Sequence, residues 1–168
     1  MKTLIKNGRV ITPGETINGY VLYEDGVIKE IGIGECSCAA DEVIDAEGRY
    51  VSPGFIDIHT HGAGGSDFMD GTVEAFLTAA QMQASHGATL VYPTTLTSSN
   101  EVLFETFKTY EKALEANARG AAFGGLHLEG PYFNPKQAGA QDPRYLRNPA
   151  PADYMEILSR SNHIARMS

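Results

Sequence analysis

Two histidines separated by one residue end an apolar stretch in the segment VSPGFIDIHTHGAGG (51–65). On an extended strand His59 and His61 project to the same side, because side chains alternate between the two faces. Two imidazoles on one face can bind a single cation that activates water, and the glycines within 62–65 let the backbone approach closely. The pattern predicts a metal site. The alternative is one histidine that caps a strand and one that faces solvent.

A second group of candidate residues lies in GGLHLEGPYFNP (124–135). His127 and Glu129 also share a strand face, and a carboxylate among apolar residues and glycines is costly to bury without a positive partner. The predicted strand contains no lysine or arginine, so a divalent cation is the natural partner for Glu129. The alternative is an ion-paired residue at the strand end. For His127, a metal ligand and a residue that orients the ligands both remain open.

Two polar segments provide further candidates. In KQAGAQDPRYL (136–146), Gln141 and the backbone near Ala140 could contact a substrate, and the alternative is a plain surface loop. The hydroxyls of PTTLTSS (93–99) either line the mouth of the site or cap the following helix, and we favour the cap.

The amino-terminal third has the hydrophobic pattern of β-structure. Short runs rich in Val, Ile, Leu and Tyr fill residues 1–52, and the expected turn pairs between them are Asn7-Gly8, Asp25-Gly26 and Glu47-Gly48. We predict a small β-sandwich segment over 1–52.

The rest of the chain, 53–168, alternates strands with helices. Strand-like runs at 54–59, 88–97 and 121–130 are separated by helical periodicity, with caps expected at Thr72 and at Ser99 or Asn100, and a third helix is expected near Pro151. This order is typical of an α/β fold with a parallel sheet. A (β/α)8 TIM-type barrel needs about 250 residues, but only 116 remain after residue 52 (168 − 52). We expect the first three βα units of a truncated barrel, and the alternative is a compact three-stranded unit.

Composition excludes several functions. The net charge of −8, from 13 basic and 21 acidic residues, argues against nucleic acid or an anionic membrane as partner. Cys36 and Cys38 are too few for a disulfide scaffold, and we expect them to be reduced. No stretch has the length of a signal peptide core or a membrane span. We expect a cytoplasmic protein.

The segments around His59 and Glu129 resemble those of a known family. SPGFIDIHTHG resembles the first barrel strand of the amidohydrolase superfamily, while GLHLEGPYFNPKQAGAQDP and GATLVYPTTLTSS resemble the N-acetylglucosamine-6-phosphate deacetylases. The resemblance covers nearly the whole chain. It implies a hydrolase that removes the acetyl group from N-acetylglucosamine 6-phosphate, giving glucosamine 6-phosphate and acetate.

The resemblance also implies residue roles. Glu129 matches the metal-binding glutamate, His59 and His61 match ligands of a second metal, and Ala140 and Gln141 match a substrate-contacting pair. The implied cofactor is a divalent metal, zinc first, with Fe, Co, Mn or Mg as alternatives. The implied partner is a small amino sugar phosphate, and the complete enzyme is expected to be a homodimer. Because the family takes a catalytic aspartate, two more histidines and its phosphate-binding groups from later strands, we expect an amino-terminal fragment that is inactive alone.

Two other functions remain open. One is a different superfamily hydrolase, dihydropyrimidinase-like or amino-acid deacylating. Such enzymes often bridge two metals with a modified lysine, and the motif at Glu129 argues against this. The other is a non-catalytic α/β module that binds a partner.

Overall fold

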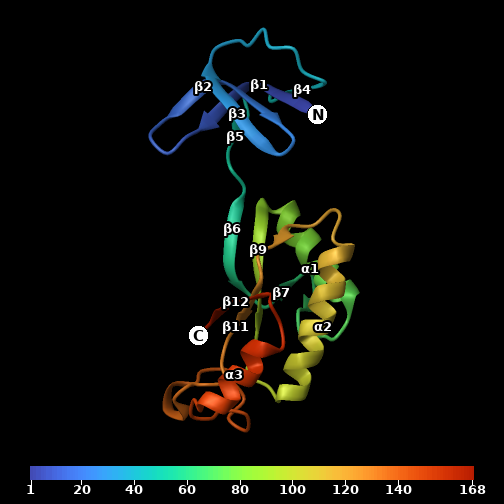
Figure 1. The fold of residues 1–168 in the computed structure, drawn as a ribbon. Coiled ribbons are helices and arrows are strands. Elements are labelled where there is room, and N and C mark those ends of the chain that lie inside the picture. Colours follow the sequence, from blue (N-terminus) through green and yellow to red (C-terminus); the bar gives the residue numbers. More distant parts are fainter. The chain divides into compact units, whose positions relative to one another are not determined.

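The computed structural model describes residues 1–168, which divide into two units, Met1–Pro53 and Gly54–Ser168 (Figure 1). The first unit is a five-stranded sheet in the order β3-β2-β1-β4, with β5 also paired to β1. The β1, β2 and β3 strands are antiparallel neighbours, whereas β4 and β5 run parallel to β1. The strands of this unit are β1 (Lys2–Ile11), β2 (Thr16–Glu24), β3 (Val27–Ile33), β4 (Glu42–Asp45) and β5 (Tyr50–Val51).

Only two of the three expected turn pairs are turns. Asp25 and Gly26 join β2 to β3 with φ values of 50° and 79°, the left-handed conformation that a two-residue hairpin requires. Asn7 also has a positive φ, of 55°, but β1 continues through it and the register with β2 shifts between Ile5 and Gly8. The prediction of a turn at Asn7-Gly8 is therefore wrong, because the extra residue is absorbed as a β-bulge.

The two cysteines lie between β3 and β4. Cys36 and Cys38 form a disulfide, so the expectation of reduced thiols is wrong. Their Cα atoms are 5.3 Å apart, which is within the range that a disulfide spans. Both side chains are partly buried, and they pack on the cluster formed by Leu4, Tyr20 and Leu22.

The second unit is built on a parallel sheet, as the alternating pattern predicts. The β6 strand pairs with β9, β9 pairs with β10 and β11, and β11 pairs with β12, all in parallel. Sequence-adjacent βα units therefore lie side by side, which brings the carboxyl ends of β6, β9 and β11 to one edge. The strands are β6 (Phe55–Thr60), β7 (Gly62–Ala63), β8 (Ser66–Asp67), β9 (Ala88–Thr95), β10 (Ala122–Phe123), β11 (Leu126–Leu128) and β12 (Ile164–Met167).

Three α-helices and a short 3₁₀ helix complete this unit. They are α1 (Val73–Ser85), α2 (Asn100–Ala116), η1 (Pro135–Gln137) and α3 (Pro151–Ser159). The expected caps are confirmed, since the Thr72 hydroxyl accepts from the Ala75 N–H at 3.2 Å and the Ser99 hydroxyl accepts from the Val102 N–H at 3.4 Å. The α1 and α2 helices lie side by side against the sheet (Figure 1). The shared core is aromatic and aliphatic, and its fully buried members include Phe68, Phe76, Phe107, Tyr110, Leu126, Leu128 and Ile157.

The sheet departs from expectation in two places. The third predicted strand, 121–130, is interrupted at Gly124-Gly125 and becomes β10 and β11. Gly125 has φ of +119°, a conformation that other residues rarely adopt. On β6, the side chains of Phe55, Ile56 and Ile58 are exposed at 71%, 61% and 56%. Strands of parallel sheets are normally covered on both faces, so this apolar surface is unusual.

The loop from Pro131 to Arg147 is fastened at its ends. The Arg147 N–H donates to the Pro131 carbonyl oxygen at 3.2 Å, and the Arg147 guanidinium donates to both carboxylate oxygens of Asp153 on α3, at 2.6 and 3.0 Å. The Tyr132 hydroxyl donates to the same carboxylate at 2.7 Å. These hydrogen bonds, that from Arg147 above all, lower the pKa of Asp153 to about 2, while burial and the contact with Asp153 raise the pKa of Tyr132 to about 12. Both residues of the predicted substrate-contacting pair, Ala140 and Gln141, lie in this loop.

No helix in the structure has both the length and the apolar character needed to cross a membrane.

Candidate metal centre

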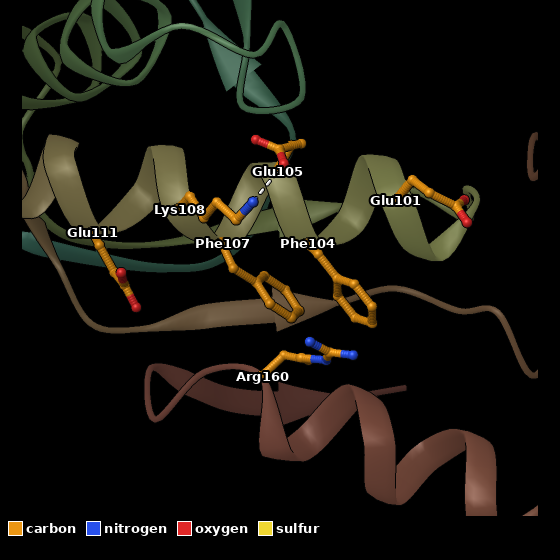
Figure 2. Close-up of a pocket in the computed structure, with 7 residues that line it drawn as sticks. All are labelled: Glu101, Phe104, Glu105, Phe107, Lys108, Glu111 and Arg160. Atoms are coloured by element: carbon orange, nitrogen blue, oxygen red, sulfur yellow. Dashed lines mark hydrogen bonds and ion pairs between the residues drawn. The ribbon is translucent and has the colours of Figure 1, made fainter.

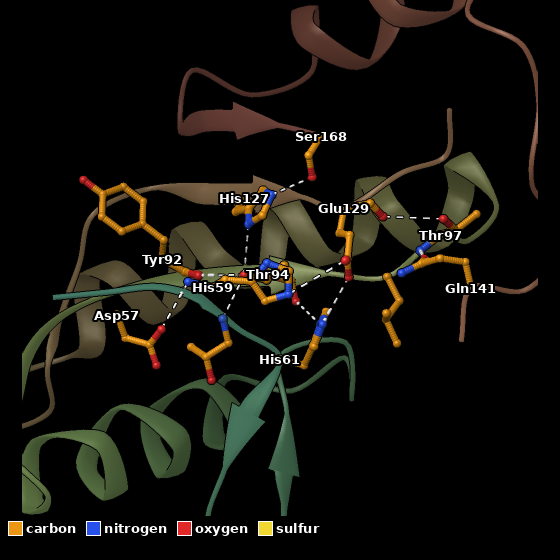
Figure 3. A network of polar contacts seen from close by, with 12 residues as sticks. Asp57, His59, His61, Tyr92, Thr94, Thr97, His127, Glu129, Gln141 and Ser168 are labelled. Atoms are coloured by element: carbon orange, nitrogen blue, oxygen red, sulfur yellow. Dashed lines mark hydrogen bonds and ion pairs between the residues drawn. The ribbon is translucent and has the colours of Figure 1, made fainter. Parts of the chain in front are cut away.

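His59, His61 and Glu129 come together at the carboxyl edge of the parallel sheet (Figure 3). One potential ligand atom from each lies within 4.8 Å of the other two. The Nε2 atom of His61 is 3.2 Å from Glu129 Oε2, and the Nε2 atom of His59 is 3.8 Å from Glu129 Oε1. The three side chains are 42%, 33% and 21% exposed for His59, His61 and Glu129, so the cluster is partly shielded yet open to a ligand.

The strand order explains how the cluster forms. His59 is the penultimate residue of β6, His61 directly follows that strand, and Glu129 directly follows β11. The β9 strand pairs with both β6 and β11, so the two ends face each other across it. The two imidazole centroids are 5.1 Å apart, so the rings share one side of the sheet, as the spacing predicts.

The hydrogen bonding of His61 requires a positive charge, a proton or a cation, between its Nε2 and Glu129. Its Nδ1 atom is 3.1 Å from the carbonyl oxygen of Thr94, which can only accept a hydrogen bond. Nδ1 of the neutral ring therefore carries the hydrogen, and Nε2 presents a lone pair to the Glu129 carboxylate. Two acceptors at 3.2 Å repel each other unless a proton or a cation lies between them. Imidazole nitrogen with carboxylate oxygen is a ligand set suited to zinc and related divalent ions.

His127 lies beside the cluster and is completely buried. Its Nδ1 is 3.3 Å from the Thr94 hydroxyl, its Nε2 is 2.9 Å from the Ser168 hydroxyl, and its ring centroid is 5.0 Å from that of His59. Burial, with a contribution from Arg166, lowers the pKa of His127 below its ordinary value, so the ring is neutral. Since both ring nitrogens have hydrogen-bonding partners, this arrangement favours the orienting role over the ligand role.

The two residues predicted to contact a substrate, Ala140 and Gln141, differ in their exposure. Ala140 is exposed, whereas Gln141 is buried and its Oε1 accepts from the Thr97 N–H at 2.8 Å. The Thr97 hydroxyl in turn is 3.5 Å from the carbonyl oxygen of Glu129. Gln141 is therefore tied to the ends of β9 and β11, next to the candidate metal ligand.

Two residues near the cluster were missed by sequence reasoning. Asp57 accepts from the His59 N–H at 3.1 Å, and its position two residues before His59 on the same strand could have indicated this. Thr94 contacts both His61 and His127. It lies in PTTLTSS, whose hydroxyls we assigned mainly to a helix cap; Ser99 is that cap, but Thr94 is not.

A separate cavity of about 400 Å³ lies between α2 and the end of α3 (Figure 2). Phe104, Phe107 and Arg160 line it, and it shares no lining residue with the His59, His61 and Glu129 cluster. The Arg160 guanidinium stacks on the Phe104 ring at 4.8 Å. Because the candidate metal ligands do not line this cavity, we place the candidate chemistry at the carboxyl edge of the sheet.

The fold and the cluster define an α/β protein with a candidate cation site at the carboxyl ends of parallel strands. Residues 42–146 match the model of the amidohydrolase family. The chain belongs to this family, as the His-x-His segment predicts.

Among curated relatives, the chain is 34% identical over 149 residues to the N-acetylglucosamine-6-phosphate deacetylase of Bacillus subtilis, covering 86% of this chain and 38% of that protein. It is 30% identical over 125 residues to the N-acetylgalactosamine-6-phosphate deacetylase of Escherichia coli O157:H7, covering 74% of this chain and 33% of that protein. The chain thus spans well under half the length of these relatives.

Among solved structures, the fold matches the N-acetylglucosamine-6-phosphate deacetylase of Pasteurella multocida with a TM-score of 0.86 at 24% identity. The match covers 99% of this chain and 44% of that one. At this identity the likeness concerns the fold.

Proposed function

We propose that residues 1–168 form the amino-terminal part of a metal-dependent amide hydrolase that removes the acetyl group from N-acetylglucosamine 6-phosphate. The observation that carries the proposal is the approach of His61 Nε2 to Glu129 Oε2 at 3.2 Å, with His59 beside them, at the carboxyl edge of a parallel sheet. The relatives that resemble the chain act on acetylated amino sugar phosphates according to their names, which supports this substrate class.

Each residue of the cluster has a defined role in this proposal. Glu129, His59 and His61 would hold a divalent cation, with zinc as first choice because the set combines imidazole and carboxylate. When bound, such an ion polarises an amide carbonyl and lowers the pKa of a water molecule to about 7. The main-chain carbonyl of Glu129 lies 3.5 Å from the Thr97 hydroxyl, and Thr97 in turn donates its N–H to Gln141.

Gln141 is the proposed substrate contact, together with the backbone at Ala140. Since its Oε1 accepts from Thr97, the amide nitrogen is the group left to donate to a hydroxyl or phosphate oxygen of the sugar. The bond to Thr97 holds this donor in one orientation near Glu129. A fixed donor close to the reacting carbonyl contributes through positioning of the substrate.

We further propose that residues 54–168 are the first part of a (β/α)8 barrel. The parallel pairing of β6, β9, β11 and β12 in chain order supports this architecture, since barrel strands follow one another in sequence. The exposed apolar side chains of β6 also support it, because a neighbouring barrel strand and helix would cover them. In such an enzyme the general base would come from a later strand, so the 168-residue chain alone should have little deacetylase activity.

The test is an assay of the polypeptide encoded by the complete reading frame, on N-acetylglucosamine 6-phosphate, N-acetylgalactosamine 6-phosphate and a hydantoin. We expect release of acetate from the first substrate, loss of turnover on treatment with a chelator, and recovery with Zn²⁺. Preferential turnover of the galactosamine compound would reassign the sugar. Turnover of the hydantoin alone would overturn the proposal.

The alternative of a non-catalytic module is tested on the chain itself. Purified protein and a Glu129→Gln variant are compared for bound metal after incubation with Zn²⁺ and removal of excess ion. We expect metal with the parent chain and a clear loss with the variant. Equal metal content in both, or none in either, would contradict the assignment of the cluster.

A further inference from the structure

Thr94, at the end of β9, contacts each of the strands that carry the candidate metal ligands. It is completely buried, and it pairs with His127 in the β9–β11 register. Its carbonyl oxygen lies 3.1 Å from His61 Nδ1, and its hydroxyl oxygen lies 3.1 Å from the Thr60 nitrogen and 3.3 Å from His127 Nδ1 (Figure 3). One residue therefore touches β6 and β11 through both its main chain and its side chain.

The donors and acceptors around the Thr94 hydroxyl can be counted. A hydroxyl has one hydrogen to donate and two lone pairs to accept with. It donates to the Tyr92 carbonyl oxygen at 3.0 Å, and the Thr60 N–H occupies one lone pair. With the hydroxyl hydrogen on the Tyr92 carbonyl, the remaining lone pair faces His127 Nδ1, and this assigns a hydrogen on Nδ1 that is donated to Thr94. His127 Nε2 then accepts from the Ser168 hydroxyl at 2.9 Å.

The same residue determines which nitrogen His61 offers to a cation. The Thr94 carbonyl oxygen holds the hydrogen of His61 on Nδ1, which leaves Nε2 as the free lone pair directed at Glu129. The hydroxyl adds to this control, because its bond to the Thr60 N–H fixes the backbone immediately before His61. A hydrogen bond to the non-coordinating nitrogen is the usual means by which proteins orient a metal-binding histidine.

We infer that Thr94 is a positioning residue of this site: its hydroxyl fixes the Thr60–His61 backbone and the tautomer of His127, and its carbonyl directs His61 Nε2 toward the cation position. The part of this inference that concerns a cation rests on the proposed function. The part that concerns tautomers rests only on the hydrogen-bond geometry.

Three substitutions test the role of the Thr94 hydroxyl, since all of them keep the main-chain carbonyl. Thr94→Val keeps the shape and burial but removes the hydroxyl, while Thr94→Ser keeps the hydroxyl. Thr95→Val is the matched control, because Thr95 is also buried and is the next residue on β9, so its side chain lies on the opposite face. Circular dichroism of all three variants checks that the fold is retained.

The first measurement is the tautomer of His127 and His61 in the 168-residue chain without metal, from long-range ¹H–¹⁵N spectra at pH 8. We expect hydrogen on Nδ1 of both rings in the parent chain, in Thr94→Ser and in Thr95→Val. In Thr94→Val, His127 should move its hydrogen to Nε2, where Ser168 can accept it. Hydrogen on Nε2 of His127 in the parent chain, or an unchanged tautomer in Thr94→Val, would overturn the inference.

The second measurement is Zn²⁺ affinity by competition with a chromophoric chelator. Loss of a residue that orients a ligand typically weakens metal binding by 10- to 100-fold. We expect a loss of about that size in Thr94→Val and less than about threefold change in Thr94→Ser and Thr95→Val. Equal weakening by Thr94→Val and Thr95→Val would mean a general packing effect and would contradict the positioning role. If the parent chain shows the expected tautomers but binds no Zn²⁺, the tautomer assignment stands and the metal assignment of the proposed function is wrong.

Discussion

His61 Nε2 and Glu129 Oε2 lie 3.2 Å apart although they follow strands that do not pair with each other. The β9 strand separates β6 from β11, and the two side chains meet across its end. Because Thr94 holds a hydrogen on the other nitrogen of His61, this contact joins two acceptors and is favourable only with a positive charge between them.

Replacement of the carboxylate is expected to weaken cation binding. Glu129→Gln keeps the side-chain size but removes the negative charge, so we expect Zn²⁺ affinity of the chain to fall by more than about 10-fold, the lower limit for loss of a residue that merely orients a ligand. Isothermal titration calorimetry measures this directly. Glu111→Gln on α2 is the control, and an equal effect of both variants would indicate only a change in net charge.

Acid should weaken the attachment of the loop to α3. Asp153 has a pKa of about 2, against an ordinary value of 3.8, chiefly because Arg147 donates to it. A depressed pKa stabilises the fold above the ordinary value, and this contribution is lost as the pH falls from about 4 through about 2. The shift corresponds to about 2 kcal/mol. We expect Asp153→Asn to lower the free energy of unfolding by about this amount at pH 7 and by progressively less toward pH 2. A difference from the parent chain that does not change with pH would contradict this assignment.

Truncation of a core aromatic should strongly destabilise the second unit. Phe76 is fully buried, and its ring contacts Phe68, Tyr110 and Phe123 with centroid distances of 5.0, 6.0 and 5.9 Å. We expect Phe76→Ala to lower the free energy of unfolding by about 3–5 kcal/mol, because a large cavity remains. Urea denaturation measures the change. Leu158→Ala, at a position 43% exposed, should cost far less.

Reduction of the disulfide should have a small effect. Cys36 and Cys38 have a sequence separation of 2, and the entropy that a disulfide removes from the unfolded chain grows with the length of the closed loop. We expect reduction to cost about 1–2 kcal/mol in the first unit. Hydrogen exchange of β1 and β2 amides with and without a phosphine reductant measures this. A Cys38→Ser chain should not respond to the reductant, and complete loss of protection in the parent chain would mean that the bridge is essential.

The apolar surface of β6 should make the 168-residue chain associate. Ile56 is 61% exposed on β6, a strand that pairs on one side only. An exposed apolar edge strand can pair with the edge strand of another molecule. We expect sedimentation velocity to show oligomers whose fraction rises with concentration, and Ile56→Lys to reduce them. Val102→Lys changes an isolated exposed valine on α2 and should have no such effect. A concentration-independent monomer of the parent chain would contradict this prediction.

The parts of the fold that the sequence predicts are those specified locally. The caps at Thr72 and Ser99 are confirmed because a hydroxyl and the amides it accepts from lie within one turn of helix. The geometry of His59 and His61 follows from strand alternation alone. The approach of Glu129 to them follows from parallel strand order, once the βα alternation is recognised.

The missed features depend on partners distant in sequence. Asn7-Gly8 has a turn composition, but β1 pairs with β2 on both sides of it, so the pair becomes a β-bulge within one strand instead of a turn between two. Thr94 has no local signal, because its role arises only when His61 and His127 are brought against it from two other strands. The loop that carries the Cys36–Cys38 bridge packs on Leu4 and Leu22, which are distant in sequence. The number of cysteines alone does not reveal this packing.

The fastening of the Pro131–Arg147 loop has a practical consequence for redesign. Its two ends are held together by the Arg147 N–H and the Pro131 carbonyl, and Gln141 is bound to Thr97. The stretch 134–137 between these anchors is exposed. Since lengthening an already closed loop costs little entropy, a foreign peptide spliced into this tip should leave the cluster at Glu129 intact. The tip is therefore the place in this unit where added residues should disturb the metal cluster least.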